Sequence, residues 1–445
     1  MISAFSKHKF QMKGNLQRHH EQGVIITLVA VVMLFVIGAM AALSIDVVTL
    51  YTARSEAQLA ADGAALAAAR LIANSGATSD STGAAIATVE GSAGPAKTIA
   101  LQIAEQNHVG GQNLTAGEVT INFGGTYTNP TVTVAVQKTN LPTFFSRIWG
   151  VTTLKVAASA KAEAYNPSGA AGLVGTSPAP VALTCVKPWL LPNIDPTNSP
   201  NPIFVTATGA INNPALLGYS TTPGTPANRL RERCITCIPP PAPPIAWQYY
   251  PGSQASFPAP TSALPDCGSL YTPNQNSIVG CVQTPIACGN NTMSAVTIDT
   301  VPVSETNTAD AVNCLTHAAN RDDADQVDPS FAFSPFEFLA GNNNPVTAAI
   351  GNDVIVSSSL VTVPVFDVGP PLALVSPPSP PGTVQIVGFV QLFLNPNGVA
   401  APNGGGNNGR IQTTIINMVG CGTGWTATPI LGNGASPVAV RLISP

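Results

Sequence analysis

The chain has 445 residues, enough for roughly two or three domains, and a formal net charge of −4 at pH 7. Charged residues make up only 9% of it, whereas ordinary soluble domains contain about 25%. Because binding to nucleic-acid phosphates requires clustered lysine and arginine, this composition argues against a nucleic acid as a partner. The charge is unevenly placed: the first 21 residues sum to +3, so the remainder sums to −7.

The first expected element is a membrane-spanning helix over residues 24–45, preceded by a basic cytoplasmic stub at residues 1–23. The run is uncharged, and only Thr27 and Ser44 carry polar side chains. At about 1.5 Å per residue it reaches roughly 33 Å, enough for a bilayer core of about 30 Å. The basic stub predicts a cytoplasmic N-terminus. We therefore expect a single-pass protein of the inner (cytoplasmic) membrane with a periplasmic or extracellular body.

A cleaved signal peptide is the main alternative interpretation of this run. Ala39 and Ala41 place small residues at the −3 and −1 positions of a cleavage site. The run is longer than a usual signal core, however, and helix-favouring sequence continues through the site, so a retained anchor is favoured. A prepilin leader is a further alternative, and it requires glutamate at the fifth position after a glycine. The fifth residue after Gly23 is Leu28, so this processing signal is absent there.

A second helical segment, residues 46–74, continues the span without a break. Its many alanines offer a small-residue face that permits close packing, and polar residues form a stripe along it. A carboxylate at the outer end of a span is costly in lipid, so we expect Asp46 to find a partner, either Arg54 or another subunit. The alternative interpretation of the stripe is a solvated helix face. The candidate packing or partner interface consists of Asp46, Tyr51, Arg54, Gln58 and Asp62.

The overall fold class expected is α+β. Residues 46–165 are predicted to form a membrane-proximal module with helices and antiparallel strands. Residues 75–94 are expected to be a loop or a weak helix. Helices are predicted over residues 95–107 and 141–149, and strands over residues 118–123, 131–137 and 151–164.

Proline separates this module from the rest of the chain. Only three of the 41 prolines precede residue 166. Because proline removes a backbone donor and fixes φ, residues 166–445 cannot be helical in bulk, and we expect a loop-rich, mainly β region there. The clearest strands are predicted over residues 353–356, 361–366, 384–394, 411–419 and 438–443.

All the cysteines lie beyond the span. Their even number in a chain expected to be exported indicates disulfides, although sequence does not give the pairing. Cys234 and Cys237 form a Cys-x-x-Cys motif, but neither a thioredoxin-like context nor a second zinc half-site accompanies it, so a structural disulfide is favoured. The candidate disulfide cysteines are Cys185, Cys234, Cys237, Cys267, Cys281, Cys288, Cys314 and Cys421.

No motif for catalysis, cofactor binding or a metal site is found. The sequence lacks Gly-x-Ser-x-Gly, His-Glu-x-x-His, P-loop and dinucleotide patterns. Four aspartates in residues 322–328 could offer oxygen ligands to Ca²⁺, but without the glycine and glutamate of an EF-hand a solvated acidic loop is favoured. Cys314, near His317, is expected to be bridged rather than nucleophilic. We expect a protein that is not an enzyme and holds no cofactor.

Residues 20–165 resemble the TadE/TadG-like Flp pilus-assembly proteins, particularly the TadG-like N-terminal segment. The family pattern has a glycine before one apolar helix, then an aspartate, a tyrosine, an arginine and an alanine-rich Gln-x-Ala-Ala-Asp block. Here these are Gly23, Asp46, Tyr51, Arg54 and residues 58–67. A second block at residues 141–150, followed by a strand ending near residue 162, is similar to the segment that closes the membrane-proximal module in that family.

The resemblance implies a membrane-anchored, non-enzymatic component of a Flp/Tad-type pilus assembly or secretion apparatus. The partners it implies are the lipid bilayer and other pilus-assembly or pilin-like membrane proteins. Several relatives carry a von Willebrand A-type metal site, whose Asp-x-Ser-x-Ser motif is absent here. The alternative function is a surface adhesin or matrix-binding protein that works through residues 166–445. An exported hydrolase is disfavoured because no triad or metal set is visible.

Overall fold

The structure is a computed structural model. It describes residues 17–170 without a gap and a series of segments beyond them. These segments are residues 181–193, 204–206, 209–212, 217, 229–232, 248–260, 271–287, 295–298, 305–316, 324–328, 330, 334–342, 344, 357–367, 383–399, 411–421, 430–432 and 436–443.

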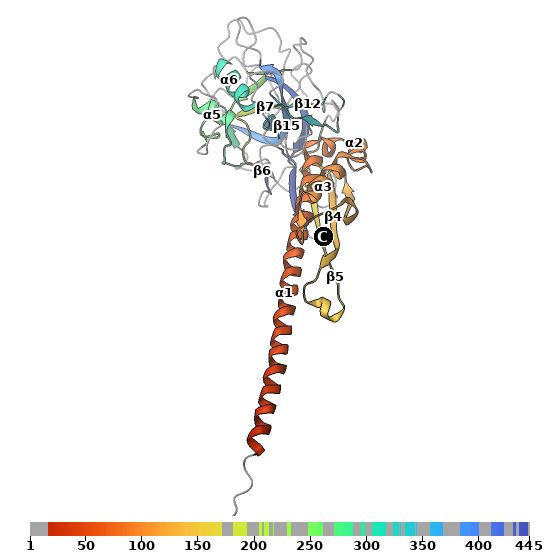
Figure 1. Cartoon of the computed structure of the whole chain (residues 1–445). Coiled ribbons are helices and arrows are strands. Elements are labelled where there is room, and N and C mark those ends of the chain that lie inside the picture. Colours follow the sequence, from red (N-terminus) through yellow and green to blue (C-terminus); the bar gives the residue numbers. More distant parts are fainter. Residues whose placement is uncertain are drawn as a thin grey trace, which may run out of the picture.

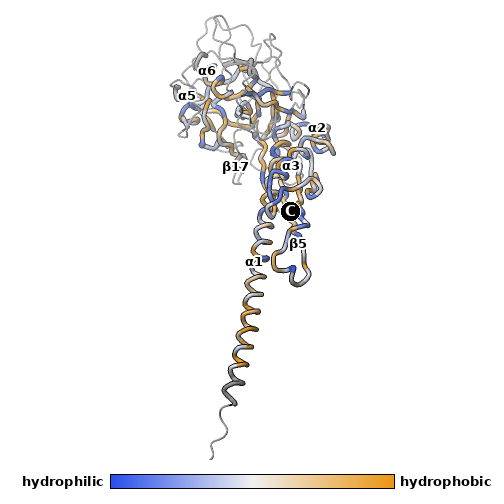
Figure 2. Tube along the Cα trace, in the orientation of Figure 1, coloured by the Kyte–Doolittle hydropathy of each residue, from blue (hydrophilic) through white to orange (hydrophobic). Residues whose placement is uncertain are grey.

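A single long helix, α1 (Gln17–Asn74), forms the axis of the molecule (Figure 1). Its 58 residues span about 87 Å at roughly 1.5 Å per residue. The first half stands free and its apolar side chains are exposed, whereas the second half packs against the body. Figure 2 shows that this free half is the continuous apolar stretch. The predicted passage from an apolar run into a second helical segment is therefore confirmed.

The second half of α1 packs on a four-stranded antiparallel sheet with the order β18-β5-β4-β3. Alternation along β4 places Val132, Val134 and Val136 in the core, while α1 contributes buried alanines such as Ala57 and Ala64. Small side chains on the helix let it approach the sheet closely. The strands are β3 (Val119–Thr126), β4 (Asn129–Pro142), β5 (Thr153–Tyr165) and β18 (Ala439–Ile443).

The edge strand β18 comes from the far end of the chain. It pairs with β5, with Ala439 opposite Tyr165, and Arg441 forms an ion pair with Glu163 across the two strands. The strand predicted over residues 438–443 is thus present, but it belongs to the sheet on α1. The change of composition near residue 166 therefore marks two sequence regions, and the sheet that packs on α1 draws on both.

Short elements complete this module. Helix α3 covers α1, and residues 75–94 form two short helices, in line with the weak helical signal there. The helix predicted over residues 141–149 is wrong in its first half, because Leu141 and Pro142 still pair with β5 at the end of β4. The elements are η1 (Ala77–Ser79), α2 (Ala84–Val89), α3 (Pro95–Glu105), β1 (His108–Val109), β2 (Gln112–Asn113), η2 (Ala116–Glu118) and η3 (Ser146–Trp149).

The remaining strands form a head at the far end of α1 (Figure 1). Its largest sheet runs β11-β15-β14-β7-β9-β8-β16, and β16 also pairs with β15, so six strands close into a ring. The predicted strands at residues 361–366, 384–394 and 411–419 are confirmed, while residues 353–356 lie outside the described residues. The strands are β7 (Trp189–Pro192), β8 (Arg229–Glu232), β9 (Gln248–Pro251), β11 (Ala295–Thr297), β14 (Leu360–Asp367), β15 (Thr383–Val399) and β16 (Ile411–Gly420).

Buried aromatic residues fill the head, among them Trp189, Tyr249 and Phe389. A helical element after β5, two further helices and two smaller sheets surround the ring. The predicted loop-rich, mainly β character of this region agrees with the described part of it. The surrounding elements are α4 (Pro167–Ala170), β6 (Val181–Leu183), α5 (Pro273–Val279), β10 (Ile286–Ala287), α6 (Glu305–Thr316), β12 (Gln326–Val327), β13 (Phe338–Leu339) and β17 (Ile430–Gly432).

Candidate functional site

The site begins at Asp46, the first ionisable residue after the apolar run of α1. Ala42, Leu50 and Ala53 share its helix face, because positions three and four apart align along a helix. Asp46 is 4% exposed. Its carboxylate accepts the backbone N–H groups of Phe144 at 3.0 Å, of the next residue along the chain at 3.1 Å and of Ser146 at 2.7 Å, and the Ser146 hydroxyl at 2.6 Å.

These bonds fasten the tip of the β4–β5 hairpin to the helix. Between the last residue of β4 and the first residue of β5, backbone N–H groups have no sheet partner, and one carboxylate accepts from three of them. A buried carboxylate without donors would be costly, whereas hydrogen bonds to a charged acceptor are among the strong ones. The expected pairing of Asp46 with Arg54 is corrected: Arg54 is exposed, and the partners of Asp46 within the chain are the amides of residues 144–146.

Gln58 and Asp62, which also belong to the interface predicted from the sequence, lie on the side of α1 that meets the sheet. Gln58 Nε2 donates to Asp62 Oδ1 at 2.8 Å and to the backbone oxygen of Ser159 at 3.2 Å. Ser159 lies on β5, so the pair joins α1 to the sheet about one helical turn beyond Arg54. Tyr51 remains exposed, as Arg54 does. The five candidates thus divide into three that make internal bonds and two that face outward.

An exposed face of α1 lies opposite the alanine face. Tyr51 is 71% exposed and Leu59 is 66% exposed, and the exposed Ser55 lies between them at helical spacing. Sequence reasoning did not single out Leu59. The spacing of residues 48, 51, 55 and 59 on one face is the signal that could have found it.

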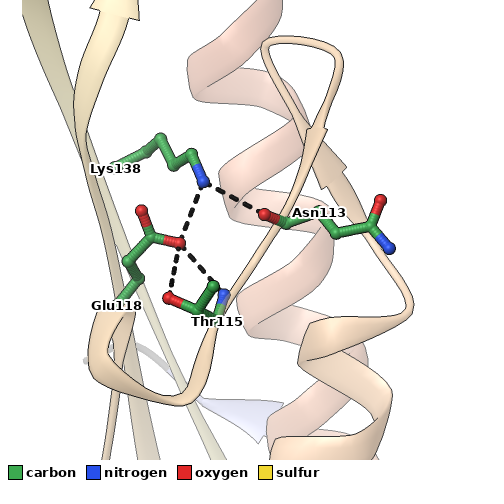
Figure 3. Close-up of polar contacts among 4 residues, drawn as sticks. All are labelled: Asn113, Thr115, Glu118 and Lys138. Atoms are coloured by element: carbon green, nitrogen blue, oxygen red, sulfur yellow. Dashed lines mark hydrogen bonds and ion pairs between the residues drawn. The ribbon is translucent and has the colours of Figure 1, made fainter.

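A second polar cluster, missed in the sequence, fixes the loop before β3 (Figure 3). Lys138 Nζ on β4 donates to Glu118 Oε2 at 2.9 Å and to the backbone oxygen of Asn113 at 3.0 Å. Thr115 donates its amide and its hydroxyl to the same carboxylate. Burial opposes ionisation of Glu118, but the hydrogen bonds from Lys138 and Thr115 outweigh it and lower the pKa of this carboxyl.

A buried polar network joins the end of α1 to the head. Asn417 on β16 donates to the backbone oxygen of Ala73 at 2.6 Å and to the side chain of Gln391 at 2.5 Å. Gln391 in turn donates to Asn74 at 3.1 Å. Ser79 in η1 donates to the backbone oxygen of residue 418 at 3.1 Å. These bonds fix the head on the top of the helix.

Gly76 makes this close approach feasible. Its φ is +79°, a conformation that L side chains rarely adopt. A Cβ at this position would lie 2.6 Å from the backbone oxygen of Ile416 on β16. The turn that ends α1 therefore rests directly on a strand of the head.

Disulfides are present in the head, as expected. Cys185 is bonded to Cys281, and Cys314 and Cys421 are also in disulfide bonds. The other candidate cysteines, Cys234, Cys237, Cys267 and Cys288, lie outside the described residues.

The expected solvated acidic loop at residues 322–328 is wrong for Asp325. This residue is buried and accepts hydrogen bonds from Gly341, Asn344 and Ser357. Its carboxylate joins three segments of the head. Residues 322 and 323 lie outside the part of the chain that the structure describes.

One family of known proteins matches the segment that contains this site. Helix Gly23–Asn74 is long and apolar enough to cross a membrane, which fits a single-pass membrane protein. No curated protein and no solved structure matches the chain. Residues 23–71 match the Tad family model, described as Flp pilus-assembly TadE/G-like. The segment that holds the apolar run, Asp46 and the alanine face is therefore similar to the TadE/G-like Flp pilus-assembly family.

Proposed function

We propose that this protein is a membrane-anchored, non-enzymatic component of a Flp/Tad-type pilus-assembly or secretion apparatus. In this proposal residues 24–45 cross the inner membrane, residues 1–23 are cytoplasmic and the head lies outside. The observation that carries the proposal is the single uninterrupted helix α1, whose free apolar half and packed alanine half both fall within the match at residues 23–71.

The architecture supports the role of a rigid stalk. From Asp46 to Asn74 the helix rises about 42 Å at roughly 1.5 Å per residue. Along this length it is packed on the sheet, and at its end the network of Asn417 and Gln391 holds the head. Such a stalk would present the head at a set height above the membrane and keep it in a set orientation to the anchor.

The proposed partners are other pilus-assembly or pilin-like membrane proteins. The exposed face of Tyr51, Ser55 and Leu59 lies on the part of α1 outside the membrane and is available to a partner helix. A partner helix that packs on this face would cover the side chains of Tyr51 and Leu59. No specific observation favours the adhesin alternative over this one.

Charged substitutions on this face test the proposal. Tyr51→Glu and Leu59→Glu should leave the fold intact, because both side chains are exposed, but should abolish pilus assembly and co-purification with pilus-assembly proteins. Thr120→Glu, at an exposed position on β3, is the matched control and should assemble normally. Wild-type levels of pili and of co-purified partners in both test variants would argue against this interface.

A further inference from the structure

We propose that the tip of the β4–β5 hairpin, residues 143–151, is a second membrane contact, seated in the interfacial layer of the bilayer beside α1. The partner is the lipid surface itself. This inference rests on the proposed anchorage of residues 24–45, and it adds a second point of attachment to the first.

The position of the tip follows from the Asp46 bonds. The apolar run ends at Ile45, and the carboxylate of the next residue holds the amides of residues 144–146. The tip is therefore at the level where the helix leaves the hydrocarbon. Figure 1 shows the same relation: the hairpin reaches back along α1, and its tip is the part of the body that extends furthest beside the free half of the helix.

The side chains of the tip suit an interface between lipid and water. Phe144 is 63% exposed and Val151 is 42% exposed, although both belong to a body whose other large apolar side chains are mostly buried. Val47, next to Asp46 on α1, is exposed as well. Apolar side chains such as Phe insert at the boundary between headgroups and acyl chains, and the exposed Arg147 could reach lipid phosphates from there.

The buried carboxylate would otherwise contradict this placement. An isolated aspartate at the edge of the hydrocarbon is costly. Asp46 accepts four hydrogen bonds from the tip, so its charge is enclosed by donors at the point where lipid begins. The same bonds that position the tip therefore shield this acidic group from lipid.

Depth measurements on the full-length protein test the inference. The protein is reconstituted, with its disulfides intact, in vesicles of phosphatidylethanolamine and phosphatidylglycerol. A nitroxide is attached through an encoded ketone amino acid at position 144, so the native cysteines remain untouched. Matched labels occupy position 35, within the apolar run, and position 59, on the outward face of α1. Collision with oxygen and with a water-soluble nickel chelate reports the depth of each label.

We expect position 35 to be deep, position 59 to behave as in water, and position 144 to show a several-fold higher ratio of oxygen to nickel accessibility than position 59. If position 144 matches position 59 while position 35 is deep, the tip contact is overturned and the anchorage stands. If position 144 is closed to both reagents, protein covers it and the lipid contact is overturned. If position 35 also behaves as in water, the anchorage itself fails, and the tip contact with it.

Discussion

The Asp46 carboxylate accepts hydrogen bonds from both the backbone amide and the side-chain hydroxyl of Ser146, a residue 100 positions further along the chain. Together with two neighbouring amides, this contact makes a long-range tie between the helix and the sheet at the foot of the module. Several of the stabilities expected below depend on whether such contacts between distant parts of the chain are kept.

Removing this carboxylate should loosen the hairpin tip. Asp46→Ala leaves the amide donors of residues 144–146 without this acceptor, and we expect it to lower the free energy of unfolding. Hydrogen exchange at residues 144–146 should accelerate. Asp46→Asn keeps one acceptor oxygen and should lose less. Unchanged exchange at these amides in Asp46→Ala would show that the tip is held by other contacts.

The alanine face of α1 should tolerate no enlargement. Ala64 is fully buried against the sheet, so Ala64→Leu forces side chains apart and should lower the free energy of unfolding by about 2 kcal/mol. Ser55→Leu on the exposed face is the matched control, with an expected change within about 0.5 kcal/mol. Urea unfolding of the detergent-solubilised protein measures both, and equal stability of the two variants would contradict the packing described for α1.

Deletion of residues 436–445 should damage the membrane-proximal module, although that module lies at the other end of the sequence. Without β18 the edge of β5 is open, and Glu163 loses Arg441. We expect faster proteolysis within residues 119–165 and more self-association.

Arg441→Ala removes only the ion pair and serves as the milder comparison for this deletion. If the deletion variant resists proteolysis as well as the full chain does, the three remaining strands hold the sheet by themselves. The same reasoning affects any test of the adhesin alternative, because removal of residues 170–445 would take away β18 along with the head.

Acid should weaken the Glu118 cluster. The folded protein lowers the pKa of Glu118 below its ordinary value of 4.5, so the unfolded chain binds the proton more readily. The stabilisation is present above that value and is lost as the pH falls through the lower folded pKa. Glu118→Gln should therefore reduce the loss of stability on acidification, measured as the free energy of unfolding against pH. If the free energy of unfolding falls on acidification as much in Glu118→Gln as in the wild type, this linkage is contradicted.

Lys187 should make the stability of the head depend on pH at alkaline rather than acid pH. Its buried Nζ donates to the backbone oxygens of Ile278 and Gly280, and burial lowers its pKa to about 7. Between that pH and the ordinary value of 10.5, the unfolded chain holds more protons, so the stability of the head should rise with pH. Lys187→Met removes the titrating group and should flatten this rise. A slope equal to that of the wild type would indicate that Lys187 stays charged in the fold.

The parts of the fold that were predictable from sequence are those set by local patterns. Helix α1 follows from an uncharged run joined to an alanine-rich helix, and strands such as β14 follow from alternation and β-branched residues. What sequence could not give is long-range. The pairing of β18 with β5, and the partner of Asp46, depend on segments that meet only after the chain folds.

Local signals also misled. Proline at position 142 suggested the start of a helix, yet β3 no longer runs beside β4 there, so a proline can remain in the strand with one side unpaired. The polar stripe on α1 was only partly an outward face, since residues such as Gln58 turn to the sheet. Spacing alone does not say which neighbour a polar side chain will meet.

The unbroken course of α1 makes the protein a lever. The first proline of the chain is Pro95, α1 continues as a helix through Gly38, and Gly63 packs near Ile103. No hinge therefore separates the apolar half of this helix from the half that carries the head. A tilt of about 20°, ordinary for a spanning helix, would sweep the end of α1 sideways by about 14 Å over the stretch beyond Asp46. The thickness of the surrounding bilayer, by setting that tilt, would then decide how far across the membrane surface the head can reach.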